Sequence, residues 1–162
     1  MPGKDASVTI RTAQRRDCDA IVAITEAAFA PVAVEALIEK MLGPTGGASW
    51  VHIMAEVIRN DLKRNPEGCF VAEIGGKVAG YVTTTINTLA SRGIIDDLAV
   101  AADCQGRGIG RRLLETALAH FRSLGLKQAK IETLACNEVG QHLYPSLGFR
   151  EVVRQIHYIM AL

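Results

Sequence analysis

The chain has 162 residues, of which 49% are apolar, enough to fill the core of one domain without metals or disulfides. Lysine and arginine total 18 against 17 aspartate and glutamate residues, so no global field attracts nucleic acid or an anionic membrane. Residues 1–9 lack the apolar core of a signal peptide, and no later stretch has the unbroken apolar length of a membrane span. We therefore expect a single cytoplasmic domain over residues 1–162, binding neither nucleic acid nor membrane.

The four cysteines, Cys18, Cys69, Cys104 and Cys136, are widely spaced. They form no C-x-x-C pair and no Cys/His cluster with zinc spacing, so we expect no metal. Free thiols in a reducing compartment fit this spacing best.

The first third of the chain predicts one strand and three helices. Residues 7–12 alternate like a strand, and Asp17 is a candidate N-cap for a helix that ends near residue 29. Glycines between residues 43 and 47 separate a helix at 33–42 from one that Ser49 can cap and that stops at residues 65–66. The spacing of this last helix predicts an apolar face formed by Trp50, Ile53, Val57 and Ile58.

The middle of the chain predicts a three-stranded meander. The β-rich runs 69–74 and 77–87 are joined by Gly75 and Gly76, a strong hairpin signal. A loop at 91–93 returns the chain into a third strand, residues 94–100.

A glycine-rich run, Gln105 to Gly110, follows this strand and precedes a helix-like segment at 111–124. Glycine backbones approach a ligand closely, and the following helix adds its positive end, so the run predicts a phosphate cradle. Arg111 stands where a dinucleotide fingerprint needs its third glycine, and Arg111 and Arg112 replace the Lys and Ser/Thr of a Walker loop. Two interpretations of the run therefore stay open: a site for a diphosphate-bearing cofactor of another class, or a turn that only caps the helix.

The last third predicts a crossover back to the sheet. The helix leads to a strand at 129–135, a short helical stretch at 137–147 and a terminal strand at 150–160. Together these elements predict an α/β fold with a mixed six- or seven-stranded sheet and helices on both faces.

Four segments in this order resemble the GNAT superfamily of acyl-CoA N-acyltransferases: residues 95–100, the Q-x-x-G-x-G loop at 105–110, Asn137, and the L-Y-x-x-L-G-F element at 143–149. The resemblance is clear from about residue 68 onward. It implies acetyl-CoA as co-substrate, bound between two splayed central parallel strands, at 94–100 and 129–135. The residues it assigns to the cofactor are Leu98, Ala99, Val100, Gln105, Gly106, Arg107, Gly108, Ile109, Gly110, Arg111 and Asn137. Only the main chain of Leu98 and Val100 is assigned to binding; their side chains fit an ordinary core.

The same resemblance supplies candidate catalytic residues. Tyr144 is the candidate acid for the departing thiolate, although Pro145 biases it away from helical geometry and it could simply be a packed tyrosine. Glu132, expected in mid-strand, is the candidate base, and Asp96 competes with it. For either acid the alternative is a solvated or salt-bridged carboxylate.

The implied activity is acetyl transfer from acetyl-CoA to a primary amine of a small molecule, an amino acid or a protein, by direct attack in a ternary complex. A covalent route is disfavoured because no histidine stands in a pairing context with Cys104 or Cys136. Two alternatives are a non-catalytic acyl-CoA-binding sensor and a toxin that modifies charged transfer RNA, for which the near-neutral charge is unfavourable. The resemblance is also compatible with a homodimer.

Overall fold

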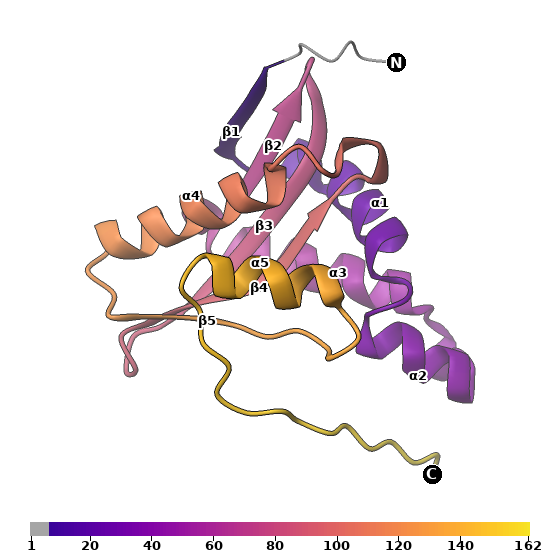
Figure 1. Cartoon of the computed structure of the whole chain (residues 1–162). Coiled ribbons are helices and arrows are strands. Elements are labelled where there is room, and N and C mark those ends of the chain that lie inside the picture. Colours follow the sequence, from indigo (N-terminus) through magenta and orange to yellow (C-terminus); the bar gives the residue numbers. More distant parts are fainter. Residues whose placement is uncertain (1–6) are drawn as a thin grey trace.

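A five-stranded sheet runs through the centre of the computed structural model, which describes residues 7–162 (Figure 1). The strands follow one another in chain order, with three antiparallel pairings and a final parallel one between β4 and β5. Their bounds are β1 (Val8–Thr12), β2 (Phe70–Ile74), β3 (Lys77–Asn87), β4 (Arg92–Val100) and β5 (Gln128–Ile131). The predicted hairpin is confirmed, with Gly75 and Gly76 both left-handed at φ 55° and 78°.

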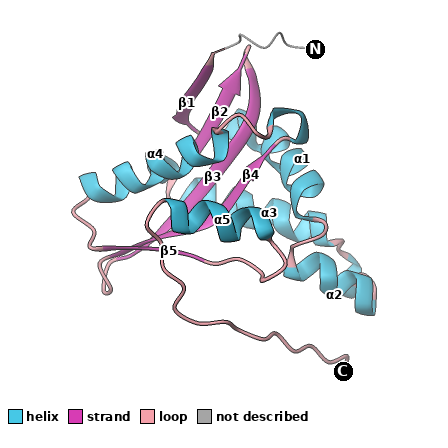
Figure 2. Cartoon of the chain, viewed as in Figure 1, coloured by secondary structure: helices cyan, strands magenta, loops and turns pink. Residues whose placement is uncertain are grey.

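Helices cover both faces of this sheet, as Figure 2 shows in cyan. They are α1 (Cys18–Phe29), α2 (Val34–Leu42), α3 (Trp50–Arg64), α4 (Ile109–Ser123) and α5 (Glu138–Ser146). Leu113 and Phe121 of α4 pack in one core with Val82 of β3, while Ile21 of α1 and Ile58 of α3 pack in a second core on the opposite face. Within residues 7–162 no single helix could cross a membrane; only Arg15–Phe29 and α2 taken together, bent by 65°, match a span in length and composition.

A glycine lets α4 lie close to the start of β4. A Cβ on Gly93 would lie 2.4 Å from the ring of Phe121, so only glycine fits beneath this side chain. The contact fixes the end of α4 over the place where β4 pairs with β5.

The two parallel strands separate after a short paired stretch. Pairing runs only from Arg92 opposite Gln128 to Ile95 opposite Ile131, whereas β4 continues to Val100. The N–H of Ala101 donates to the carbonyl oxygen of Ala79 on β3 at 2.9 Å, so by alternation the main-chain groups of Leu98 and Val100 face away from β3. The expected splay is confirmed, and it leaves these main-chain groups along an open edge of β4.

A β-bulge marks the point where the strands part. Asp97 lies opposite Thr83 and Ile95 lies opposite Thr84, so Asp96 is the extra residue with no partner on β3. The last β4–β5 pair is Ile95 with Ile131, and Asp96 therefore sits at the vertex of the splay.

The C-terminal part of the chain differs from expectation. β5 ends at Ile131 rather than at residue 135, because its pairing with β4 stops there. The chain then turns at 134–137, where the N–H of Asn137 donates to the carbonyl oxygen of Leu134. The predicted terminal strand at 150–160 is wrong: residues 150–162 form no regular secondary structure, so the described sheet has five strands rather than six or seven. Alternation alone does not make a strand, since a strand also needs a partner edge to satisfy its main-chain groups.

Candidate active site

The glycine loop forms the start of α4. Gly106 and Gly108 both have φ of 73°, the left-handed region that side chains disfavour, and Gly108 is the residue directly before α4. A Cβ at either position would meet nothing within 4 Å, so glycine is needed here for the backbone conformation and not to relieve crowding. The first turn of the 15-residue helix carries no acidic residue. The loop therefore presents its glycine backbone and the positive end of a helix dipole toward open space.

Hydrogen bonding ties this loop to the open edge of β4. The side-chain amide of Gln105 donates to the carbonyl oxygen of Val100 at 3.2 Å. Ile109 is only 1% exposed and packs in the core beneath α4, so it can offer a ligand its N–H but not its side chain. The cradle and the open edge thus form one continuous surface.

One of the arginines around the loop is held by contacts with neighbouring side chains. Arg111 donates to the hydroxyl of Ser146 on α5 at 2.6 Å and lies 3.8 Å from the carboxylate of Glu115. Arg111 therefore connects α4 to α5, while Arg112 is exposed and Arg107 is half-buried within the loop.

At the vertex, Asp96 is open to solvent on one side, while the protein around its carboxylate desolvates it and the charges of Asp61 and Glu132 act on it. It accepts a hydrogen bond from the Thr85 hydroxyl at 3.2 Å. Burial by the surrounding protein, followed by the charge of Asp61, raises its pKa to about 6, against the opposing effects of Thr85 and Arg64. A carboxylate with this pKa is ionised at neutral pH and can accept a proton there.

Two further carboxylates, which the sequence analysis missed, lie beside Asp96. Burial and the charges of Asp61 and Asp96 raise the pKa of Asp97 to about 7. Asp61 on α3 is 5% exposed, and its Oδ2 atom is buried without a hydrogen-bond partner among the described residues. Burial also raises the pKa of Asp61, and Arg64 opposes this.

Helical spacing could have revealed Asp61. The buried face of α3 consists of Ala55, Ile58 and Asp61, three residues apart, so the carboxylate occupies a core position. The predicted face was partly wrong, since Val57 is 40% exposed.

Glu132 does not have the expected mid-strand position. It lies directly after the end of β5, its side chain is 72% exposed, and its carboxylate is 2.6 Å from the ammonium group of Lys130. Glu132 is thus the salt-bridged surface carboxylate that was the alternative to a catalytic base. The geometry therefore favours Asp96 over Glu132 as the proton acceptor.

Tyr144 lies on α5 and Asn137 directly precedes this helix, which covers the same face of the sheet as α4. The helix runs through Tyr144 and Pro145, so the expected bias of Tyr144 away from helical geometry is wrong; Pro145 falls in the last turn, where it removes one hydrogen bond at most. Tyr144 is half-buried, its ring meets that of Phe149 edge-on at 6.3 Å, and burial raises its pKa while the nearby Thr133 hydroxyl opposes this.

Asn137, which the resemblance assigns to the cofactor, also has a structural use. Its side-chain oxygen accepts from the N–H of Gly140 at 3.2 Å, which caps α5, and its amide donates to the Thr133 hydroxyl at 2.9 Å. Through Thr133 it also fixes the surroundings of Tyr144.

The cysteines lie outside this chemistry. All four are free thiols; Cys18, Cys69 and Cys104 are buried, and Cys136 is exposed. Burial raises the pKa of Cys69 to about 11 and also raises that of Cys104, which disfavours the nucleophilic thiolate form. In the part of the chain from residue 7 onward, no three acidic, histidine or cysteine side chains are arranged as metal ligands.

Comparisons with known proteins agree with this geometry. Residues 33–149 match the model of the Acetyltransferase (GNAT) family. A mycothiol acetyltransferase of Propionibacterium freudenreichii subsp. shermanii is 30% identical over 151 residues, covering 90% of this chain and 44% of that protein. An N-alpha-acetyltransferase of Sulfurisphaera tokodaii is 30% identical over 108 residues, covering 60% of this chain and 65% of that protein. The chain thus spans less than half of the first of these relatives and about two thirds of the second.

Among solved structures, the PaiA N-acetyltransferase of Thermoplasma acidophilum in complex with coenzyme A has the same fold. It superimposes with a TM-score of 0.71 at 19% identity, covering 89% of this chain and 90% of that one.

Proposed function

Since the chain belongs to the acetyltransferase (GNAT) family, we propose that it transfers an acetyl group from acetyl-CoA to a primary amine by direct attack in a ternary complex. One observation carries this proposal: the glycine cradle before α4 continues directly into the open edge of β4, which ends at an ionisable carboxylate. A phosphate-bearing ligand with an extended amide arm fits this arrangement, and its reactive end would reach Asp96.

Each part of acetyl-CoA has matching groups on this path. The N–H groups of the loop from Gly106 to Gly110 and the positive end of α4 suit the diphosphate. The main-chain groups of Leu98 and Val100 can pair with the amides of the pantetheine arm as an added strand would. The arm then runs from the loop back along β4, which places the thioester at the vertex.

The transfer needs a free amine lone pair and a proton for the sulfur. Asp96 accepts a proton from the substrate ammonium, directly or through water, and the amine nitrogen attacks the thioester carbonyl carbon. The new C–N bond forms as the C–S bond breaks, and the electron pair of that bond leaves on sulfur. Tyr144 then gives its hydroxyl proton to the thiolate, and its raised pKa keeps this hydroxyl protonated at neutral pH before the transfer. The nitrogen loses its remaining extra proton as it becomes an amide, and this proton, passed through water, restores the tyrosine hydroxyl.

We also propose that the protein is located in the cytoplasm. Three buried free thiols and one exposed free thiol suit a reducing compartment, which supports the cytoplasm.

Calorimetry with acetyl-CoA, with free CoA and NADH as controls, tests the cofactor site. Gly108→Leu should weaken acetyl-CoA binding at least about tenfold, because a side chain in left-handed backbone displaces the cradle. Gly125→Leu is the matched control: Gly125 follows α4 at its other end, has φ of 72° and is equally uncrowded. Equal binding by both variants would remove the loop from the cofactor site.

A panel of amines with labelled acetyl-CoA then separates enzyme from sensor. Transfer to any amine supports the enzyme. Micromolar binding of CoA species with no transfer to any amine supports the non-catalytic sensor, and no binding at all overturns both.

A further inference from the structure

The vertex holds more negative charge than a single proton acceptor requires. Asp61, Asp96 and Asp97 come from α3 and β4 and lie close enough for the charge of Asp61 to raise the pKa of both others. No ion pair joins any of the three to a lysine or arginine in the described chain, although Arg64 acts on Asp61 and Asp96 at longer range. Glu132 adds to the negative potential at Asp96 but is itself neutralised by Lys130.

This arrangement is unfavourable for the free protein in two ways. Asp61 buries a carboxylate oxygen that has no hydrogen-bond partner among the described residues. It also lies in the last turn of α3, where the helix dipole repels a negative charge. The buried hydroxyl of Thr83, opposite Asp97 on β3, opposes the rise in the pKa of Asp97 and therefore adds no further cost.

A bound cation would offset both costs. Counting charges, three carboxylates against Arg64 leave two unbalanced negative charges when all are ionised, so one ammonium group would still leave one. No three acidic side chains in residues 7–162 converge as metal ligands, so the cation that suits the cluster is a larger organic one.

We propose that Asp61, Asp96 and Asp97 form the acceptor subsite and that the acceptor is a diamine or longer polyamine, whose reacting amine lies at Asp96 and whose second ammonium group lies against Asp61 and Asp97. This inference rests on the proposed function, because it assigns the amine that the transfer needs. Asp61 is then a specificity-determining residue, since it adds negative charge that a monoamine leaves unbalanced.

Two amines of the same length test this inference. 1,4-Diaminobutane and 1-aminobutane carry the same reacting group and differ by one ammonium. We expect kcat/KM for the diamine to exceed that for the monoamine at least tenfold, and this ratio to fall at least fivefold in Asp61→Asn through a higher KM for the diamine. Glu56→Gln, on the exposed side of α3, is the matched control and should keep the wild-type ratio. A wild-type ratio near one, or an unchanged ratio in Asp61→Asn, overturns the proposal.

Calorimetry of both amines with the CoA-bound protein distinguishes a failure of the proposed transferase function from a failure of the proposed subsite. Preferential binding of the diamine without acetylation would contradict the transferase function and leave the subsite standing. Acetylation of both amines without diamine preference would contradict only the subsite. If Asp61→Asn does not fold, Asp97→Asn replaces it, and the wild-type comparison is decisive by itself.

Discussion

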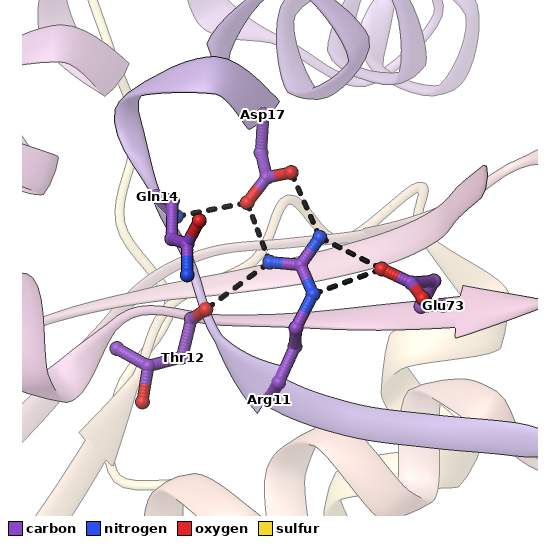
Figure 3. Close-up of polar contacts among 5 residues, drawn as sticks. All are labelled: Arg11, Thr12, Gln14, Asp17 and Glu73. Carbon is purple, nitrogen blue, oxygen red and sulfur yellow. Dashed lines mark hydrogen bonds and ion pairs between the residues drawn. The ribbon is translucent and has the colours of Figure 1, made fainter. Parts of the chain in front are cut away.

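One cluster of carboxylates lies by β1 and β2 and another by β4 and α3, and they differ in whether an arginine pairs with them. Near β1, Asp17 accepts from both terminal nitrogens of Arg11 at 2.7 and 2.9 Å and from the N–H of Gln14 at 2.8 Å (Figure 3). Glu73 of β2 binds the same guanidinium at 2.9 Å. At the vertex, no lysine or arginine of the described chain forms an ion pair with Asp61, Asp96 or Asp97.

The pKa values follow this difference. Hydrogen bonding to Arg11 lowers the pKa of Asp17 in spite of its burial, whereas burial raises the pKa values of Asp61, Asp96 and Asp97. Repulsion by the charge of Asp61 adds to this rise at Asp96 and Asp97. Burial is common to both clusters, so the paired cation decides the direction. The first cluster stabilises the free protein. The second destabilises the free protein, and a positively charged ligand would offset this cost.

Asp17→Asn should produce the largest loss of stability. It removes the charge of a side chain that is 5% exposed and leaves Arg11 with only Glu73, so the free energy of unfolding should fall by about 3 kcal/mol. Urea unfolding measures this change. Glu73→Gln is the control, since the Glu73 side chain is 29% exposed and its replacement should cost about 1 kcal/mol. Equal losses in the two variants would contradict the central place of Asp17.

Asp96→Asn should reduce kcat by about a hundredfold, because general-base catalysis contributes at least that much. In the unmodified protein, kcat/KM should rise with pH through the pKa of about 6 and then level off, and this rise should vanish in the variant. Glu132→Gln removes an exposed carboxylate paired with Lys130 and should keep both the rate and the pH profile. A normal profile in Asp96→Asn together with an altered one in Glu132→Gln would reverse the assignment of the base.

The sequence predicted local elements well and long-range placement poorly. The hairpin at Gly75–Gly76 and the left-handed glycines before α4 were predictable, because the residues themselves impose these conformations. Glu132 was misplaced because the end of β5 depends on where β4 stops pairing, and alternation does not encode that. Asp61 could not be linked with Asp97 from the sequence, because its charge acts on Asp97 only once α3 packs on the sheet.

The two clusters should also give the stability curve two opposing limbs. Between pH 4 and pH 7 the native state binds more protons than the unfolded state at Asp96 and Asp97, so these groups lower stability as pH rises. Asp17 acts oppositely: its contribution is present above the unfolded carboxyl pKa of about 4 and is lost as pH falls through its lower native pKa.

Urea unfolding at pH 5 and pH 7 tests the first limb. The protein should be more stable at pH 5 by on the order of 1–2 kcal/mol, and Asp97→Asn should remove most of this difference. Asp19→Asn, at an exposed position of α1, should leave the difference unchanged. A difference that survives in Asp97→Asn would mean that other groups produce this limb.

Asp61→Asn should give the smallest change and the most direct contrast with Asp17→Asn. Both variants exchange a buried aspartate for its amide, but at Asp61 the exchange removes a charge that has neither a hydrogen bond at Oδ2 nor an ion pair among the described residues. The free energy of unfolding at pH 7 should therefore stay the same or rise by up to about 1 kcal/mol. A loss comparable to that of Asp17→Asn would show that Asp61 has a stabilising partner in solution, and the vertex would then be a structural cluster like the one around Arg11.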